Sequence, residues 1–304
     1  MKITVAGEAL IDLIIDAAGN VSAYPGGAGF NVARAVAGLG GDCQFLGRTG
    51  DDAFGRRLRR ALEDSGVRVA LPEPAREPTT LALAELDAGG TAAYHFYLEG
   101  TAGGALRAED LGPDVLAGTA ALAIGGLGLV MEPIGSTLRT LLGAAPSAAT
   151  VLLDPNGRPQ AIAPGVRFAD VLEPFLARAD VVKVSTDDLL LLAPGADPRD
   201  TARGLLDRHQ VAVLVTDGPG AVTVLTAGGA DQVPVPKVSV LDTVGAGDAF
   251  VAGFLTWWTR GGHGRQDLSE HRLLLDAARA AVRVAAAACT VAGAGLPVGF
   301  RWEV

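Results

Sequence analysis

The chain has 304 residues, 49% of them hydrophobic, and a formal net charge of −9 at pH 7. This length fits one large α/β domain or two small ones, and the apolar fraction is enough for a sizeable core. The negative charge argues against nucleic acid as a partner, because phosphate backbones are bound through clusters of Lys and Arg. Cys43 and Cys289 are far apart in the sequence, so we expect buried thiols rather than a disulfide framework.

Only three lysines occur, and no stretch matches the G-x-x-x-x-G-K-[ST] phosphate loop. The N-terminal residues 1–7 read as a strand and lack the charged leader and long apolar run of a signal peptide. No segment is apolar for long enough to cross a bilayer. We therefore expect a cytoplasmic protein without a membrane partner.

Residues 2–6 predict a buried strand, and residues 10–24 predict a small hairpin outside the main sheet. Asp12 is a lone acid among the Leu and Ile residues of that hairpin. Such an acid lies either on a solvent edge or against a polar ligand, and the sequence leaves both interpretations open.

A glycine-rich turn follows, from Pro25 to Asn31, and it opens a helix. Its spacing does not match the dinucleotide fingerprint G-x-G-x-x-G, because Val32 occupies the place of the third glycine. Glycines such as Gly27 instead suggest a backbone that a ligand approaches closely. Asn31 offers both a donor and an acceptor, which suits a sugar hydroxyl.

Two β-prone runs, 79–86 and 91–98, are joined by residues 87–90 and predict a second hairpin. Tyr94, Phe96 and Leu98 share one face of the second run; we expect one face of this run to pack and one to meet substrate. With residues 10–24, this hairpin is expected to form a small β-sheet lid built from two separate segments.

From residue 120 onward, short apolar strands alternate with helical patterns. This alternation predicts a parallel sheet that is covered on both faces. The predicted strands are residues 121–124, 151–153, 181–184 and 211–215, with residues 222–226 and 232–235 as antiparallel edge strands. Ligands of such folds bind beyond the carboxyl ends of the strands, where this sequence is polar or glycine-rich.

One stretch carries the strongest functional signal, Leu241 to Phe250. Gly245, Ala246 and Gly247 are predicted to form a tight turn that opens a helix, so that backbone N–H groups converge into an anion hole. Asp248 lies beside this predicted anion hole, where a carboxylate is electrostatically unfavourable next to a bound phosphate. Asp248 is therefore interpreted as the general base for a hydroxyl that receives a phosphoryl group. The competing interpretation is an ordinary helix start with Asp in its first turn.

These motifs resemble the ribokinase-like carbohydrate kinases, also called the phosphofructokinase B family. Residues 242–250, DTVGAGDAF, are similar to the C-terminal signature of that family, D-T-x-G-A-G-D-x-F. Residues 26–40 look like its N-terminal signature, and residues 50–55 and 65–67 match the stretch that follows. The resemblance covers nearly the whole chain. It implies a single domain over residues 1–304, with a three-layer α/β/α fold, a mostly parallel sheet and the small β lid.

The resemblance also implies roles for individual residues. Asp248 would be the catalytic base, with Gly245, Ala246 and Gly247 as the anion hole. Sugar hydroxyls would be bound by Asp12, Gly27 and Asn31, with Phe96 on the lid as a further substrate contact. ATP would lie along Thr216, Gly218 and Gly220. Asp242 and Thr243 would lie near a monovalent-cation site, for which K+ is the candidate.

One motif departs from the family, in which N-x-x-E helps to place magnesium and phosphate. Here it reads Ser185-Thr186-Asp187-Asp188. Ser185 is assigned to the nucleotide site. Asp188 keeps the carboxylate on a shorter side chain, which favours water-bridged contact with Mg2+ over direct ligation.

The sequence around residues 7–12 and 154–159 resembles the fructokinase and 2-keto-3-deoxygluconate kinase branch. An Arg that would pair with a sugar-acid carboxylate is replaced by Leu98, at a cost to anion binding of about 1.5–3 kcal/mol. This favours a neutral ketose such as fructose, although Arg158 remains available for an anionic substrate.

We therefore expect an ATP-dependent sugar kinase. The alternatives are a 2-keto-3-deoxygluconate kinase, a ribokinase or a nucleoside kinase, and a sugar-binding regulator that has lost turnover. The exposed strands of the lid also offer a surface for a homodimer.

Overall fold

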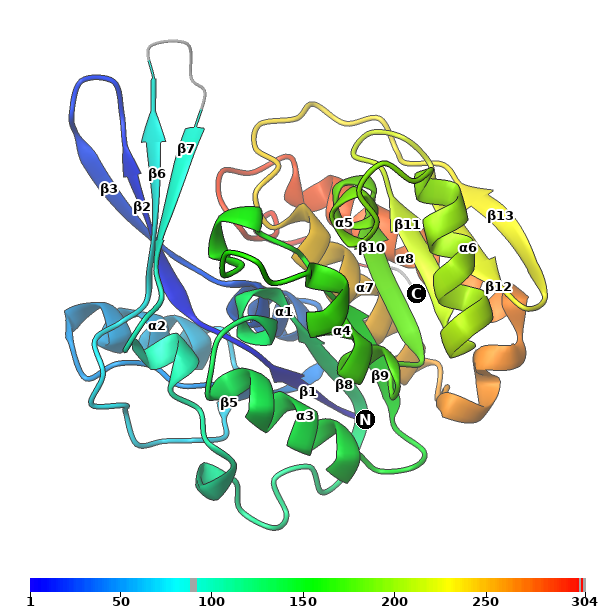
Figure 1. Cartoon of the computed structure of the whole chain (residues 1–304), viewed down its shortest axis with the longest axis horizontal. Coiled ribbons are helices and arrows are strands. Elements are labelled where there is room, and N and C mark those ends of the chain that lie inside the picture. Colours follow the sequence, from blue (N-terminus) through cyan, green and yellow to red (C-terminus); the bar gives the residue numbers. More distant parts are fainter. Residues whose placement is uncertain (88–91, 301, 303–304) are drawn as a thin grey trace.

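The computed structural model describes residues 1–87, 92–300 and 302, and its strands form a nine-stranded and a four-stranded sheet (Figure 1). The large sheet has the order β13-β12-β11-β10-β9-β8-β1-β4-β5. Its strands are β1 (Lys2–Ala6), β4 (Asp42–Leu46), β5 (Arg68–Val69), β8 (Thr119–Gly125), β9 (Thr150–Asp154), β10 (Val181–Ser185), β11 (Ala212–Thr216), β12 (Val222–Thr226) and β13 (Gly229–Val233).

Strands β5 to β11 pair in parallel, whereas β12 and β13 are antiparallel at one edge. This confirms the predicted mostly parallel sheet with an antiparallel edge. The last strand was predicted to end at Val235 but ends at Val233. Pro234 and Pro236 follow it, and proline has no N–H to donate to a ladder, which accounts for the earlier end.

The small sheet combines β2 (Leu10–Ile15) and β3 (Val21–Gly26) with β6 (Leu81–Leu86) and β7 (Ala92–Tyr97). Its order is β3-β2-β6-β7, and the parallel pair β2–β6 joins two segments that are distant in the sequence. This is the sheet expected from the two hairpins. The predicted turn of the second hairpin falls mostly outside the described residues. In Figure 1 the small sheet projects away from the large sheet.

Helices cover both faces of the large sheet, with a hydrophobic cluster under each layer (Figure 1). The helices that contribute to one cluster are α1 (Ala28–Gly38), α2 (Ala53–Asp64), α7 (Ala246–Arg260) and α8 (His271–Ala288). Those that contribute to the other are α3 (Ile134–Ala144), α4 (Phe168–Leu176), α5 (Thr186–Leu192) and α6 (Pro198–His209). The three-layer arrangement is therefore confirmed.

Short 3-10 helices connect these elements. They are η1 (Ala102–Gly104), η2 (Ala108–Asp110), η3 (Gly126–Leu129), η4 (Pro159–Ala161) and η5 (Arg265–Ser269). Within the described residues, no helix has the length and apolar character needed to traverse a bilayer.

Candidate active site

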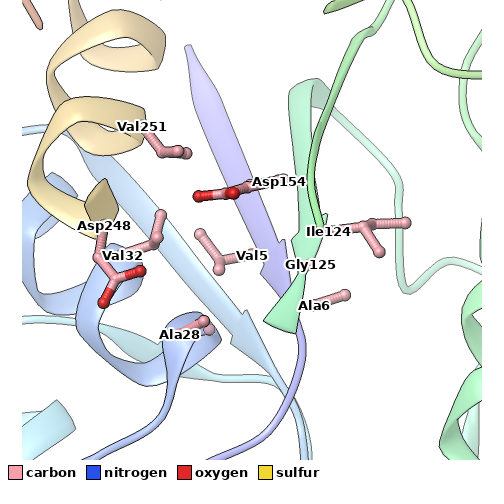
Figure 2. Close-up of a pocket in the computed structure, with 11 residues that line it drawn as sticks. Val5, Ala6, Ala28, Val32, Ile124, Gly125, Asp154, Asp248 and Val251 are labelled. Carbon is pink, nitrogen blue, oxygen red and sulfur yellow. The ribbon is translucent and has the colours of Figure 1, made fainter. Parts of the chain in front are cut away.

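The carboxyl ends of three parallel strands meet the first turns of α1 and α7 at a small cavity. Gly125 and Asp154 end β8 and β9, Ala28 begins α1, and Asp248 lies in the first turn of α7; all four line the cavity (Figure 2). Its volume is about 20 Å³, which is room for roughly one water molecule. The cavity therefore marks where the two signature motifs meet, and it is too small to hold a sugar.

The start of α7 has the geometry expected of an anion hole. Gly245 precedes the helix with φ at +76°, and a Cβ there would lie 2.6 Å from the Cβ of Ala294, so both backbone conformation and space require glycine. In the part of the chain that the structure describes, the N–H groups of Gly245, Gly247 and Asp248 have no acceptor. The N–H of Ala246 donates to the carbonyl of Thr243 at 3.2 Å. Three donors are thus available at the positive end of a helix dipole.

Asp248 is buried beside these donors. The Nδ2 of Asn31 donates to its Oδ2 at 2.9 Å, while its Oδ1 has no hydrogen-bond partner among the described residues. Burial raises the pKa of Asp248 to about 7; the hydrogen bond from Asn31 and the charge of Lys183 oppose this rise, and Asp154 and Glu8 add to it. A carboxylate with a free oxygen and a pKa near neutrality is suited to accept a proton from a hydroxyl.

Glu8 holds the glycine-rich turn in place, and the sequence analysis did not assign it a role. Its buried carboxylate accepts hydrogen bonds from the N–H groups of Ala28 and Gly128, both at 2.9 Å. Gly27 has φ at +102°, and a Cβ there would lie 2.8 Å from the carbonyl oxygen of Glu8. The turn that presents Asn31 is therefore packed directly against the end of β1.

Asp12 extends the site into the small sheet. Burial raises its pKa to about 6; the positive charge of Arg158 opposes the rise and Glu8 adds to it. Gly26 gives Asp12 its space, because a Cβ at Gly26 would lie 2.0 Å from Oδ2 of Asp12. Asp12 is half-buried on β2, which pairs with β3 on one side and β6 on the other, and this disfavours a solvent edge.

The other predicted substrate residues lie at different depths. Arg158 is exposed after β9, where it donates to the carbonyl of Gly157 at 3.1 Å. Phe96 is half-buried, stacks on Tyr94 and packs with Leu98 against the core. On this face Phe96 and Leu98 pack, whereas Tyr94 is exposed. Contact of Phe96 with a substrate stays a prediction.

Asp188 links the loop after β9 to the end of β10 through hydrogen bonds. Its Oδ1 accepts from the N–H of Gly157 at 2.7 Å, and its Oδ2 accepts from the N–H of Ser185 at 2.8 Å and from the Ser185 hydroxyl at 2.7 Å. Within the described residues, no group of three or more His, Cys, Asp or Glu side chains could hold a metal ion. Because these oxygens are already engaged, Asp188 fits water-bridged contact with a Mg2+ that is carried by phosphate. The metal assignment stays a prediction.

The predicted nucleotide residues follow β11. Thr216 ends that strand and donates to the carbonyl of Val184 at 3.4 Å. Gly218 is exposed with φ at +52°, and the N–H of Gly220 closes a turn onto Asp217 at 2.8 Å. These residues form a compact turn beyond the carboxyl end of β11, on the same side as the carboxyl ends of the parallel strands β9 and β10.

Asp242 shapes the loop before α7. It accepts from the N–H of Val244 at 3.0 Å and from the N–H of Gly293 at 2.8 Å, and Thr243 beside it is exposed. No observation tests the proposed cation site here.

A buried ion pair was also missed by the sequence analysis. The Nζ of Lys183 in β10 lies 3.1 and 3.0 Å from the two carboxylate oxygens of Asp154. The detectable signal was a lysine in the middle of an otherwise apolar predicted strand.

Comparisons with known proteins give the family of this chain. The family model described as pfkB family carbohydrate kinase matches residues 1–299. A fructokinase from Klebsiella pneumoniae is 37% identical over 257 residues, which are 84% of this chain and 83% of that protein.

Solved structures give the same result. A fructokinase from Xylella fastidiosa with bound ATP has a TM-score of 0.87 and 30% identity, covering 96% of this chain and 93% of that one. An aminoimidazole riboside kinase from Salmonella enterica, complexed with aminoimidazole riboside and an ATP analogue, has a TM-score of 0.82 and 29% identity, covering 97% and 95%. The chain belongs to the pfkB family of carbohydrate kinases, phosphotransferases that act on an alcohol group.

Proposed function

We propose that this chain transfers the γ-phosphoryl group of ATP to a hydroxymethyl group of a neutral ketose, with fructose as the first candidate. The observation that carries the proposal is the side chain of Asp248. It is buried, has a free oxygen and a pKa of about 7, and lies beside three unpaired N–H groups.

The proposed reaction uses these groups directly. Asp248 accepts the proton of the sugar hydroxyl as the hydroxyl oxygen bonds to the γ-phosphorus, and the bond from that phosphorus to the β,γ-bridging oxygen breaks to release ADP. The N–H groups of Gly245, Gly247 and Asp248 stabilise charge on the transferring group. Mg2+ bound to the phosphates would neutralise further charge. The sugar itself would lie outside the small cavity, between Asp248 and Asp12.

A groove at the edge of the large sheet suits the adenine of ATP. It has a volume of about 310 Å³ and lies between the chain after β13 and helix α8, with Val233, Val235 and Val282 among its lining residues. Antiparallel pairing puts Val233 at the same end of the sheet as Thr216, because Val222 pairs with Val233 while Thr223 pairs with Val215. The predicted residues Thr216, Gly218 and Gly220 would then lie beside the nucleotide, and Ser185 beyond the neighbouring strand.

Leu98 and the fructokinase relatives favour a neutral ketose. A riboside is the second candidate, because the aminoimidazole riboside kinase matches nearly the whole fold. An acid substrate such as 2-keto-3-deoxygluconate would need Arg158 as its partner.

A substrate panel tests the proposal. ADP release is measured with ATP and Mg2+ against fructose, ribose, 2-keto-3-deoxygluconate and aminoimidazole riboside. The proposal predicts the highest kcat/KM for fructose. A higher value for another compound would reassign the substrate, and sugar binding by calorimetry without ADP release would indicate a non-catalytic regulator.

We also propose that the small sheet forms a homodimer. Its outer strands expose Val21, Tyr24, Tyr94 and Tyr97, with exposed fractions of 62, 49, 50 and 56%, and edge strands pair readily with other chains. Sedimentation of wild type and Tyr97→Lys tests this: the proposal predicts a dimer that the substitution weakens, and a monomeric wild type contradicts it.

A further inference from the structure

The ammonium group of Lys183 lies on the same side of the sheet as the start of α7. Side chains alternate along β10, and Val181 packs into the hydrophobic cluster that contains residues of α7 and α8. Lys183, two residues further on, therefore faces the same way. Its side chain is almost fully buried, at 6% exposure.

Asp154 fixes the direction of this ammonium group. Both carboxylate oxygens of Asp154 accept hydrogen bonds from Nζ, at 3.1 and 3.0 Å. No other acceptor is bonded to Nζ in the described part of the chain. Since an ammonium has three N–H donors, at least one remains available to a ligand.

Gly247 shows where the ammonium lies. A Cβ built on Gly247 would stand 3.0 Å from Nζ of Lys183, and Gly247 does not have the left-handed backbone that requires glycine. A side chain at this position would therefore crowd the neighbouring ammonium. Because the N–H of Gly247 is one of the free donors of the anion hole, the cation lies against that hole.

The charge of Lys183 is maintained by its surroundings. Burial alone would lower its pKa, but Asp154, Asp188 and Asp248 together raise it above the ordinary value. A buried ion pair is weak support for stability, because apolar residues of similar volume often stabilise a fold as well or better. A buried cation beside the free N–H groups at the start of α7 is more readily explained by function.

We propose that Lys183 is a catalytic residue whose ammonium contacts the γ-phosphoryl group at the start of α7, and that Asp154 is the positioning residue that aims it. This inference deepens the proposed function and rests on it. The positive charge of Lys183 would add to the three N–H donors as charge accumulates on the transferring group.

Lys183→Met tests the contact because it removes the charge and keeps an unbranched side chain that is only one atom shorter. We expect kcat to fall by about 10²–10³, the effect of removing one donor from a preorganised anion site, with sugar affinity from calorimetry changed by less than about threefold. The acid limb of the pH–rate profile should move to higher pH, because Lys183 lowers the pKa of Asp248. Lys2→Met at the start of β1 is the matched control and should leave these values unchanged.

Nucleotide binding gives a readout that does not depend on turnover. Lys183→Met should lose about tenfold or more in ATP affinity and much less in ADP affinity, because only ATP carries the γ-phosphate. Asp154→Asn keeps the side-chain volume and serves as the second variant if Lys183→Met does not fold. It should show smaller losses of kcat and of ATP preference, and its acid limb should move to lower pH, because Asp154 raises the pKa of Asp248.

Unchanged kcat, pH limb and ATP preference in the folded variants would overturn the role of Lys183. A wild type that binds ATP but releases no ADP with any sugar would instead overturn the proposed function. The loss of ATP preference in Lys183→Met could still be measured in that case, so the two failures are distinguishable.

Discussion

Asn31 donates a hydrogen bond from Nδ2 to Oδ2 of Asp248 at 2.9 Å, across 217 residues of sequence. The remaining oxygen of each side chain is buried without a partner among the described residues. A buried polar atom without a hydrogen-bond partner destabilises a fold. The free oxygens of Asn31 and Asp248 therefore indicate a ligand that supplies hydrogen bonds. A sugar hydroxyl could donate to the free oxygen of Asp248 and complete the arrangement.

The pH dependence of activity should report Asp248. Because burial raises its pKa to about 7 and a general base works only when deprotonated, the active fraction falls as pH decreases through this value. We expect kcat/KM to drop by about tenfold per pH unit below about 7 and to level off above it. Steady-state kinetics in buffers of constant ionic strength measure this. A flat profile from about pH 5 to 8 would contradict the assignment.

Asn31→Ala should move that acid limb to higher pH. The hydrogen bond from Asn31 favours the charged form of Asp248 and opposes the raised pKa, so its removal raises the pKa further. The control is Asn20→Ala, which removes an exposed hydrogen bond of the same kind, from Nδ2 of Asn20 to Oδ2 of Asp16 at 2.8 Å. An unchanged limb in Asn31→Ala would show that this hydrogen bond does not tune the base.

Gly245→Ala should disable the anion hole. The new Cβ would meet Ala294 at 2.6 Å and would also require a left-handed backbone, so the free N–H groups would shift. We expect kcat to fall by about 10²–10³. Gly118→Ala is the control for placing alanine on a left-handed backbone without a steric clash. Gly118 has φ at +72°, and no atom lies within 4 Å of its Cβ position. Its kcat should equal that of wild type, and equal kinetics in both variants would exclude this anion hole.

Gly26→Ala should weaken sugar binding. The added Cβ would lie 2.0 Å from Oδ2 of Asp12, so Asp12 must leave its position. We expect the KM for the sugar to rise by about tenfold or more, with kcat changed by less than about threefold. Gly143→Ala in α3, with nothing within 4 Å of the new Cβ, is the control. An unchanged KM in Gly26→Ala would remove Asp12 from the sugar site.

The sequence predicted the parts of the fold that depend on local pattern. Apolar strands alternating with helices gave the parallel sheet, and the glycine-rich stretches before Asn31 and Asp248 gave the two helix starts that meet at the cavity. Turn chemistry and hydrophobic period are local properties, so one sequence reveals them. The two-residue strand β5, Arg68–Val69, was too short to show any period.

The tertiary contacts of the site could not be predicted in the same way. Glu8 reaches the N–H of Gly128, 120 residues away, and Lys183 reaches Asp154 on the adjacent strand. Such contacts depend on strand order and register, which a single sequence does not specify. A charged residue within a buried strand pattern, as at Lys183, was the one local sign that a partner had to exist.

The most direct test of the account is the turnover of Asp248→Asn with the sugar that gives the highest ADP release. This change removes the proton acceptor and preserves the size of the side chain. We predict that kcat falls by about 10²–10⁴ with ATP and Mg2+ present, while sugar affinity from calorimetry stays within about threefold of the wild-type value. A kcat within about tenfold of wild type would contradict Asp248 as the general base.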